Sequence, residues 1–271
     1  MNKKSKLLTH AVLWIFVLIM VVPFIWMFLT SIKTYEETIR IPLQFMPESP
    51  QWINYSIVYN KFPFIQLYLN TILVTIMTVI GQLFIVSLSA YAFARLNFPF
   101  KNIIFLGLLG LMMIPGQIFL IPRFRLMVQL KLTNTLTALV LPSLFSIFGV
   151  FLLRQHFMQL PKELEESAKM DGCGYFRTFF QIMLPQVKPG LTALGIMTML
   201  GTWKELMWPI IVNSTMDKMT LSASLAMLIG EHTTYYEQVM SGAVISVFPM
   251  IILFMFFQKQ FVESVAKTGI K

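Results

Sequence analysis

The chain has 271 residues, of which 56% are hydrophobic and 12% charged, and its mean hydropathy of +0.72 lies outside the usual range of soluble proteins. Its net charge of +9 does not indicate nucleic-acid binding, because the basic residues form no stripe with aromatic stacking partners. The single Cys173 excludes an intramolecular disulfide, and the three scattered His residues lack metal-ligand spacing, so no metal site is expected.

Six apolar stretches are long enough to cross a bilayer, which takes roughly twenty residues. The first follows a basic start, but it is too long for a signal peptide and no small-residue cleavage site follows it, so we expect a retained span. Each stretch carries Gly or Pro, which membrane helices tolerate, and kinks are expected there. The sequence therefore predicts an all-α integral membrane protein with six transmembrane helices, at residues 11–30, 71–94, 103–121, 136–153, 191–212 and 241–257.

The connections between these stretches differ in character. Residues 31–69 are rich in Pro and aromatic side chains, which favours an ordered external segment over a flexible linker. Lys and Arg are more numerous in the segments that an inside N-terminus places in the cytoplasm, although Arg123 and Arg125 fall outside. The charge bias predicts a multi-pass protein with both termini cytoplasmic.

The connection 155–190, between the fourth and fifth stretches, is the most polar cytoplasmic segment and is patterned as two short helices. Pro161 suits a first helical position, and the acidic residues that follow it favour the helix dipole. Leu160, Leu164 and Ala168 recur every four residues and predict an apolar face, and Gly172 suits a helix stop. The Asp171 carboxylate either accepts hydrogen bonds from nearby backbone amides or contacts a partner.

A second helix is predicted from 175 to 184, ended by Pro185 and Pro189. Its aromatic and sulfur-containing residues are expected on one side: Phe176, Phe179, Phe180 and Met183. Both short helices would lie at the membrane surface.

The run ELEESAKMDGCGYFRTFFQIMLPQVKPGL resembles the EAA loop of ABC importer permeases, which reads Glu-Ala-Ala, two residues, Asp-Gly-Ala, and later an apolar-Leu-Pro with a further Pro. Ser167 and Cys173 depart from the pattern, but both are as small as the Ala residues they replace. By this resemblance, the residues that contact the ATPase subunit are Glu166, Ser167, Ala168, Asp171, Gly172, Cys173, Leu184 and Pro185.

The resemblance extends along nearly the whole chain to the carbohydrate branch, the maltose-type second permease with the ABC type I permease fold. It rests on phrases such as PFIWMFLTSIKTYEE, QWINYSIVY, FLLRQHF, TWKELMWPIIV and FVESVAKTGIK. Lys204 departs from that branch, which usually carries Asn after Trp there. The implied division is a first helix with an external segment in 1–64, an ABC transmembrane domain in 65–258 and a cytoplasmic tail in 259–271.

The resemblance also implies a function and partners. The chain would form half of the pathway for a sugar or oligosaccharide across a bacterial plasma (inner) membrane. A second permease, two ATP-binding subunits and an extracytoplasmic sugar-binding protein would complete the importer. ATP and Mg²⁺ would bind the ATPase subunits, with no cofactor on this chain.

Lys204 and Glu205 interrupt the otherwise apolar fifth stretch. Ionisable residues at depth usually face a cavity or a partner. The two either belong to an external interfacial belt, with Lys204 snorkelling, or mark the wall of the substrate pathway. On the second interpretation, aromatic faces would contact the apolar side of a sugar, and the pathway candidates are Tyr91, Trp203, Glu205 and Trp208.

Other classes of protein fit less well. The chain has no G-x-x-x-x-G-K-[ST] phosphate loop, so ATP hydrolysis is expected on another chain and this one is not an enzyme. An ion-driven secondary transporter would favour acidic residues deep in several spans, and only Glu205 comes close. A membrane-embedded hydrolase is disfavoured because H-E-x-x-H and G-x-S-x-G are both missing.

Overall fold

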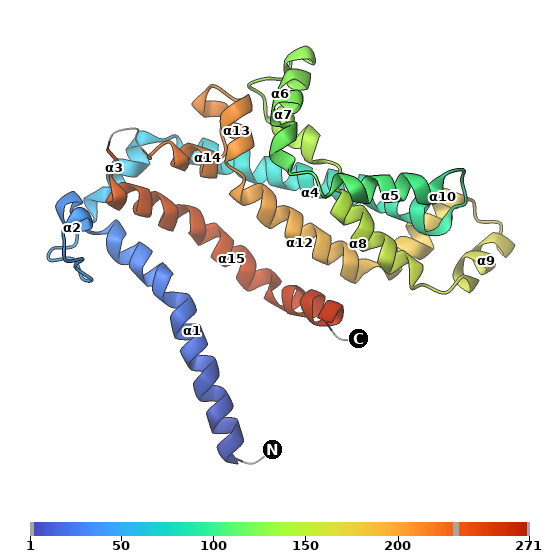
Figure 1. Ribbon diagram of the computed structural model, residues 1–271, viewed down its shortest axis with the longest axis horizontal. Coiled ribbons are helices and arrows are strands. Elements are labelled where there is room, and N and C mark those ends of the chain that lie inside the picture. Colours follow the sequence, from blue (N-terminus) through green and yellow to red (C-terminus); the bar gives the residue numbers. More distant parts are fainter. Residues whose placement is uncertain (1–2, 230–232, 270–271) are drawn as a thin grey trace. The chain divides into compact units, whose positions relative to one another are not determined.

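The computed structural model describes residues 3–229 and 233–269, and every regular element within them is a helix (Figure 1). The ends of the chain at 1–2 and 270–271, which belong to the predicted N-terminal segment and C-terminal tail, lie outside the described residues. The chain divides into two compact units, Met1–Phe64 with Leu221–Leu253, and Ile65–Thr220 with Phe254–Lys271.

The first unit contains α1 (Lys3–Ser31), α2 (Tyr35–Ile39), α3 (Ile53–Lys61), α14 (Leu221–Ala226) and the beginning of α15 (Tyr236–Gly269). The sequence predicted that residues 31–69 form an ordered segment rather than a flexible linker, and the helices α2 and α3 within it confirm this. α2 begins with a capping box: the Glu37 carboxylate accepts the Thr34 N–H at 2.7 Å, and the Thr34 hydroxyl accepts the Glu37 N–H.

Buried polar contacts fix the C-terminal end of α1. The Asn54 side-chain amide donates to the carbonyls of Ser31 and Lys33 at 2.9 and 2.8 Å, and the Ser241 hydroxyl donates to the Ser31 carbonyl at 3.0 Å. Lys33 itself is buried, with its ammonium 4.4 Å from the centre of the Trp26 ring. α3 and α15 therefore both anchor the end of α1.

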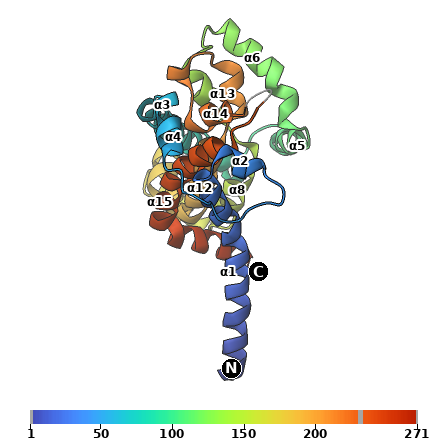
Figure 2. The ribbon, with the colours of Figure 1, turned by 90° about the vertical axis from the view of Figure 1, so that its left-hand side faces the viewer.

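The second unit is built on three helices that lie side by side, α4, α8 and α12, with the shorter helices at their ends (Figure 1). Figure 2 shows α6 and α13 together, which agrees with the contact between them. The bounds are α4 (Phe64–Arg95), α5 (Lys101–Leu111), η1 (Gly116–Phe119), α6 (Leu120–Gln129), α7 (Leu136–Val140), η2 (Leu141–Ser143), α8 (Ile147–Met158), α9 (Glu163–Met170), α10 (Tyr175–Arg177), η3 (Thr178–Met183), α11 (Leu184–Gln186), α12 (Lys188–Lys204), α13 (Met207–Val212) and η4 (Met216–Lys218).

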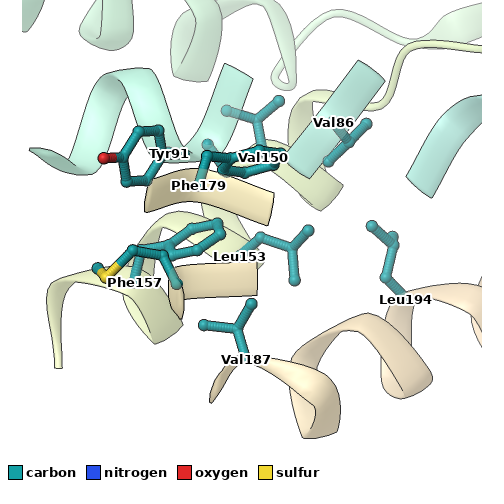
Figure 3. Packing of buried hydrophobic residues seen from close by; sticks show 10 residues of the cluster. Val86, Tyr91, Val150, Leu153, Phe157, Phe179, Val187 and Leu194 are labelled. Carbon is teal, nitrogen blue, oxygen red and sulfur yellow. The ribbon is translucent and has the colours of Figure 1, made fainter. Parts of the chain in front are cut away.

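An apolar core joins these helices to the polar connection after α8 (Figure 3). Gly190 at the start of α12 shows how closely the helices pack, because a Cβ there would lie 2.5 Å from the ring of His156 on α8. The buried members of this core are Val86, Ala90 and Tyr91 of α4, Val150, Leu153 and Phe157 of α8, Phe179 and Met183 of η3, then Val187 and Leu194.

The predicted count of six continuous membrane helices is not confirmed. Two helices of the described residues are long and apolar enough to cross a membrane, 9–31 and 64–95. Two further pairs pass only if each bent pair counts as one span: Lys101–Leu111 with Gly116–Gln129, bent by 97°, and Leu136–Ser143 with Ile147–Met158, bent by 46°. The sixth predicted stretch lies within α15.

Prolines account for the three broken stretches. Pro115 precedes η1 and Pro142 lies in the first positions of η2, at the two sharp bends. The fifth stretch breaks at Glu205 and Leu206, and Pro209 cannot donate the hydrogen bond that would continue the helix to Glu205. The expected irregularity is therefore confirmed in these three stretches, as ends of helices rather than kinks. α1 and α15 continue past Pro23 and Pro249.

Candidate functional site

The first half of the connection 155–190 is a short helix with a defined stop. α9 begins after Pro161, has three Glu residues in its first turn, and buries Ala168, as the apolar pattern predicted. At its end, the Cys173 N–H donates to the Ala168 carbonyl at 2.9 Å and the Gly172 N–H to the Lys169 carbonyl at 3.0 Å. This is a Schellman motif, and Gly172 adopts the left-handed φ of 75° that the motif requires.

The second half differs from the predicted helix 175–184 in its winding and its exposed face. The chain is helical from Tyr175 but widens into the π-helix η3 just before Pro185, whose ring would clash with the Gln181 carbonyl in a regular α-helix. Phe179 and Met183 are buried, whereas Phe176 and Phe180 are exposed. The expectation of one apolar side was therefore wrong for those two, because the π turn changes the helical phase.

The predicted coupling residues divide into an exposed set and a buried set. Glu166, Ser167, Asp171, Gly172 and Pro185 are exposed, Cys173 and Leu184 are half-buried, and Ala168 is buried. The Ser167 hydroxyl donates to the Glu163 carbonyl within α9. Within the described residues, the Glu166 and Asp171 carboxylates are in no ion pair, so both are available to a partner.

The candidates for a substrate pathway lie in different places. The hydroxyl of Tyr91 donates to the Glu165 carboxylate of α9 at 2.9 Å, which puts Tyr91 beside the 155–190 connection. Trp203 is buried near the end of α12. Glu205 and Trp208 lie together at the break between α12 and α13, where the Glu205 carboxylate accepts the backbone N–H groups of Met207 and Trp208 at 3.0 and 3.2 Å.

This contact gives Glu205 a local role that the sequence reasoning missed. The notion of one continuous helix through Glu205 was wrong, and the carboxylate instead satisfies two of the N–H groups exposed at the start of α13. The Trp208 indole N–H donates to the Ala138 carbonyl at 2.9 Å, which joins α13 to α7. The side chains at the break are therefore held in fixed positions.

A cavity of about 260 Å³ opens beside this break. Glu205 and Trp208 are in its wall, and the Arg123 guanidinium lies 5.0 Å from the centre of the Trp208 ring. Gln82 of α4 reaches across the cavity wall: its amide donates to the Ser143 carbonyl at 2.7 Å and its oxygen accepts the Thr198 hydroxyl. The remaining polar side chains of the wall are Thr78, Ser143, Ser146, Thr198, Thr202 and Thr220.

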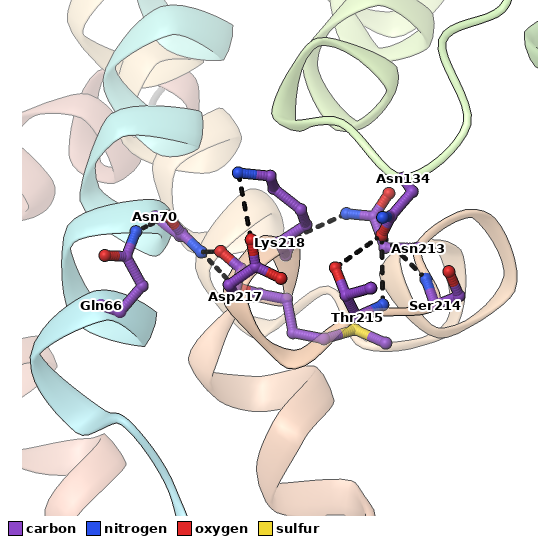
Figure 4. A network of polar contacts seen from close by, with 9 residues as sticks. Gln66, Asn70, Asn134, Asn213, Ser214, Thr215, Asp217 and Lys218 are labelled. Carbon is purple, nitrogen blue, oxygen red and sulfur yellow. Dashed lines mark hydrogen bonds and ion pairs between the residues drawn. The ribbon is translucent and has the colours of Figure 1, made fainter.

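A network of side-chain amides fixes the connection 213–219 next to the cavity (Figure 4). Asn70 of α4 donates to the carbonyls of Asp217 and Met219, both at 2.8 Å. The side-chain Oδ1 of Asn134 accepts three hydrogen bonds, from the Ser214 N–H and from the N–H and hydroxyl of Thr215, at 3.0 to 3.1 Å. The segment is therefore held by two other parts of the second unit.

Comparison with known proteins identifies the family of the chain. Residues 83–267 match the family model described as the binding-protein-dependent transport system inner membrane component. The chain belongs to this family. It is a membrane permease of the ABC importer type and not an enzyme.

The permease has relatives that match it over most of their length. It is 34% identical to the arabinooligosaccharides transport system permease protein AraQ of Halalkalibacterium halodurans, over 93% of this chain and 92% of the relative. It is 30% identical to the sn-glycerol-3-phosphate transport system permease protein UgpE of Yersinia pestis, over 94% of this chain and 93% of the relative. The family inferred from the EAA-like run and the longer phrases is thus confirmed.

The fold of the permease also has a solved counterpart. A chain of a bacterial ABC transporter involved in the import of the acidic polysaccharide alginate superposes with a TM-score of 0.79, covering 96% of this chain and 98% of that one, at 21% identity. The ABC type I permease fold is therefore shown.

Sequence reasoning missed several residues of the permease's cavity. Gln82 and Thr198 carry polar groups within apolar helices, a signal the sequence does contain. From the sequence, Arg123 was only an exception to the charge bias. The structure places it in the cavity wall. No group of His, Cys, Asp and Glu in the described part of the chain could hold a metal ion.

Proposed function

We propose that the chain forms half of the translocation pathway for a sugar or oligosaccharide in a binding-protein-dependent importer of the bacterial plasma membrane. The proposal rests chiefly on the relatives, which are transport-system permeases that match this chain over most of their length. The six apolar stretches favour six membrane crossings, and the charge bias favours cytoplasmic termini with 155–190 facing the cytoplasm. In this arrangement 65–258 is the transmembrane domain and 259–271 a cytoplasmic tail.

The partners follow from the same proposal. A second permease completes the pathway, an extracytoplasmic protein delivers the sugar, and two ATP-binding subunits hold the ATP and Mg²⁺. One of those subunits docks on the exposed part of 155–190, where the Glu166 and Asp171 carboxylates and the Schellman turn at Gly172 form a small, firmly shaped surface. A surface of this kind suits an ATPase subunit that transmits a conformational change to it in each transport cycle.

The charges of the cavity favour a neutral sugar over a phosphate ester. Arg123 could attract an anion, but the Glu205 carboxylate is in the same wall and repels one. The Trp208 ring offers an apolar face, and hydroxyl and amide groups around it offer hydrogen bonds. This combination matches the alternating apolar and hydroxyl surfaces of an oligosaccharide, which is therefore the first candidate substrate. A phosphate ester such as sn-glycerol 3-phosphate is the second candidate.

Transport by the reconstituted complex tests the substrate. The permease, its partner permease, the ATPase subunits and the binding protein are placed in liposomes with labelled arabinooligosaccharide or labelled sn-glycerol 3-phosphate. We expect ATP-dependent uptake of the oligosaccharide and none of the phosphate ester. Uptake of the phosphate ester alone would refute the neutral-sugar assignment.

Thiol labelling tests the pathway itself. In a Cys173→Ser background, Thr202→Cys puts a thiol in the cavity wall, and Lys204→Cys puts one on an exposed position outside that wall. We expect transported sugar, with binding protein, to slow labelling of Thr202→Cys by a membrane-impermeant reagent and to leave Lys204→Cys unchanged. Equal labelling of both positions with and without sugar would remove this cavity from the pathway.

A further inference from the structure

The last residue of α4 is bound to the 155–190 connection at three points. One nitrogen of the Arg95 guanidinium, Nη2, donates to the Leu160 and Pro161 carbonyls, each at 2.9 Å. Nε lies 3.2 Å from Glu165 Oε2 in an ion pair whose side chains are only 6% and 16% exposed. Arg95 thus holds both the chain entering α9 and the first turn of α9.

Tyr91 engages the other oxygen of the same carboxylate. It lies one helical turn before Arg95, on the same face of α4, and its hydroxyl donates to Glu165 Oε1 at 2.9 Å. The Tyr91 ring packs against Phe157 and Phe179, with centroids 5.6 and 5.2 Å away. The Glu165 carboxylate is therefore held by two residues of α4, and one of them is fixed by the core.

We propose that Tyr91, Arg95 and Glu165 form a latch that passes movement of α9 to α4 during transport. The inference rests on the proposed function, in which the ATPase subunit docks on the exposed part of the 155–190 connection. We class the three as positioning residues, because they lie outside the cavity assigned to the sugar and contact one another between α4 and α9. The latch also gives Tyr91 a role other than the substrate contact expected from sequence.

The shape of α4 makes it suited to carry this movement. It is one unbroken helix, and Gln82 lies thirteen residues before Arg95, which is about 20 Å along the axis. Gln82 bridges η2 and α12 across the cavity wall, so a shift of α4 must alter or break that bridge. A pocket of about 420 Å³ beside Arg95 and Glu165 leaves α9 room to move.

The first test measures sugar molecules imported per ATP hydrolysed by the reconstituted complex. Glu165→Gln keeps a hydrogen-bond acceptor for Tyr91 but removes the ion pair. Glu163→Gln on the same helix is the matched control, since Glu163 is exposed and is not one of the residues assigned to contact with the ATPase subunit. We expect the ratio to fall at least fivefold for Glu165→Gln, within the usual range of couplings between sites, and to stay unchanged for Glu163→Gln. Tyr91→Phe, which removes only the hydroxyl, should lower it less.

Two outcomes would overturn the latch in this assay. One is the same ratio for Glu165→Gln and Glu163→Gln. The other is a loss of assembled complex with an unchanged ratio in the complexes that remain, which would show a purely structural role. Absence of sugar uptake by the wild-type complex would instead count against the proposed function.

A second measurement tests the latch without any sugar. Thr202→Cys in the Cys173→Ser background reports the state of the cavity through its labelling rate. We expect ATP with vanadate to change that rate when the latch is intact and to leave it unchanged when Glu165→Gln is added. A rate that responds to ATP equally in both proteins, or in neither, would refute the inference.

Discussion

Replacing Phe179 by Ala should strongly destabilise the protein. The Phe179 ring is 1% exposed and packs against the rings of both Tyr91 and Phe157, in the core that joins η3 to α4 and α8. Removing a buried Phe side chain costs about 3–5 kcal/mol, the sum of lost apolar burial and the cavity left behind. At about 2–4 °C per kcal/mol for a chain of this size, the unfolding midpoint should fall by roughly 6–20 °C.

The assay is the heat-induced loss of monodisperse complex in detergent. Phe176→Ala is the matched control, because this Phe is three residues away on the same helical segment but 75% exposed. We expect the control to change stability by no more than about 0.5 kcal/mol, the usual effect of a surface substitution. Similar midpoints for the two variants would refute the packing described for η3.

Two further predictions concern local structure in each unit. Gly172→Ala should lower the free energy of unfolding by about 1–2 kcal/mol, because Gly172 has a left-handed φ. Gly174→Ala should be neutral, because Gly174 has a φ of −74° and no atom lies within 4 Å of the new Cβ. The same thermal assay compares the two variants. Burial raises the pKa of the Glu37 carboxyl, but hydrogen bonds from the backbone N–H groups of Glu48 and Thr34 outweigh this and hold the pKa below its ordinary 4.5. The stabilisation by Glu37 is therefore present above pH 4.5 and lost as the pH falls through the lowered value. Unfolding midpoints between pH 7 and pH 3 should fall more steeply for the wild type than for Glu37→Gln, and parallel curves would contradict this.

Local chemistry explains the features that the sequence could predict. A stop at Gly172 follows from the need for a left-handed residue after a helix, and the burial of Ala168 follows from four-residue spacing. The prolines predicted irregular backbone in the third, fourth and fifth apolar stretches. Whether each would bend or end its helix depended on neighbouring helices, which a hydropathy pattern does not contain.

The contacts that define the latch and the cavity depend on tertiary structure. Arg95 and Glu165 are far apart in sequence, and each has several oppositely charged residues that it could meet. Tyr91 was assigned to the pathway by its aromatic character, and only the placement of α9 against α4 shows what its hydroxyl contacts. Glu205 stood out in the sequence as a charge within an apolar stretch, but its bonds to α13 require the helix break to exist first.

The amides that fix 213–219 have a consequence for whatever meets that segment. Ordering one backbone residue costs about 1–2 kcal/mol of conformational entropy, and a loose loop would incur that cost at each encounter with a ligand. Here Asn70 and Asn134 have already fixed the segment during folding. A partner or solute that contacts these residues thus finds them preorganised, and its binding free energy is not reduced by the ordering of this loop.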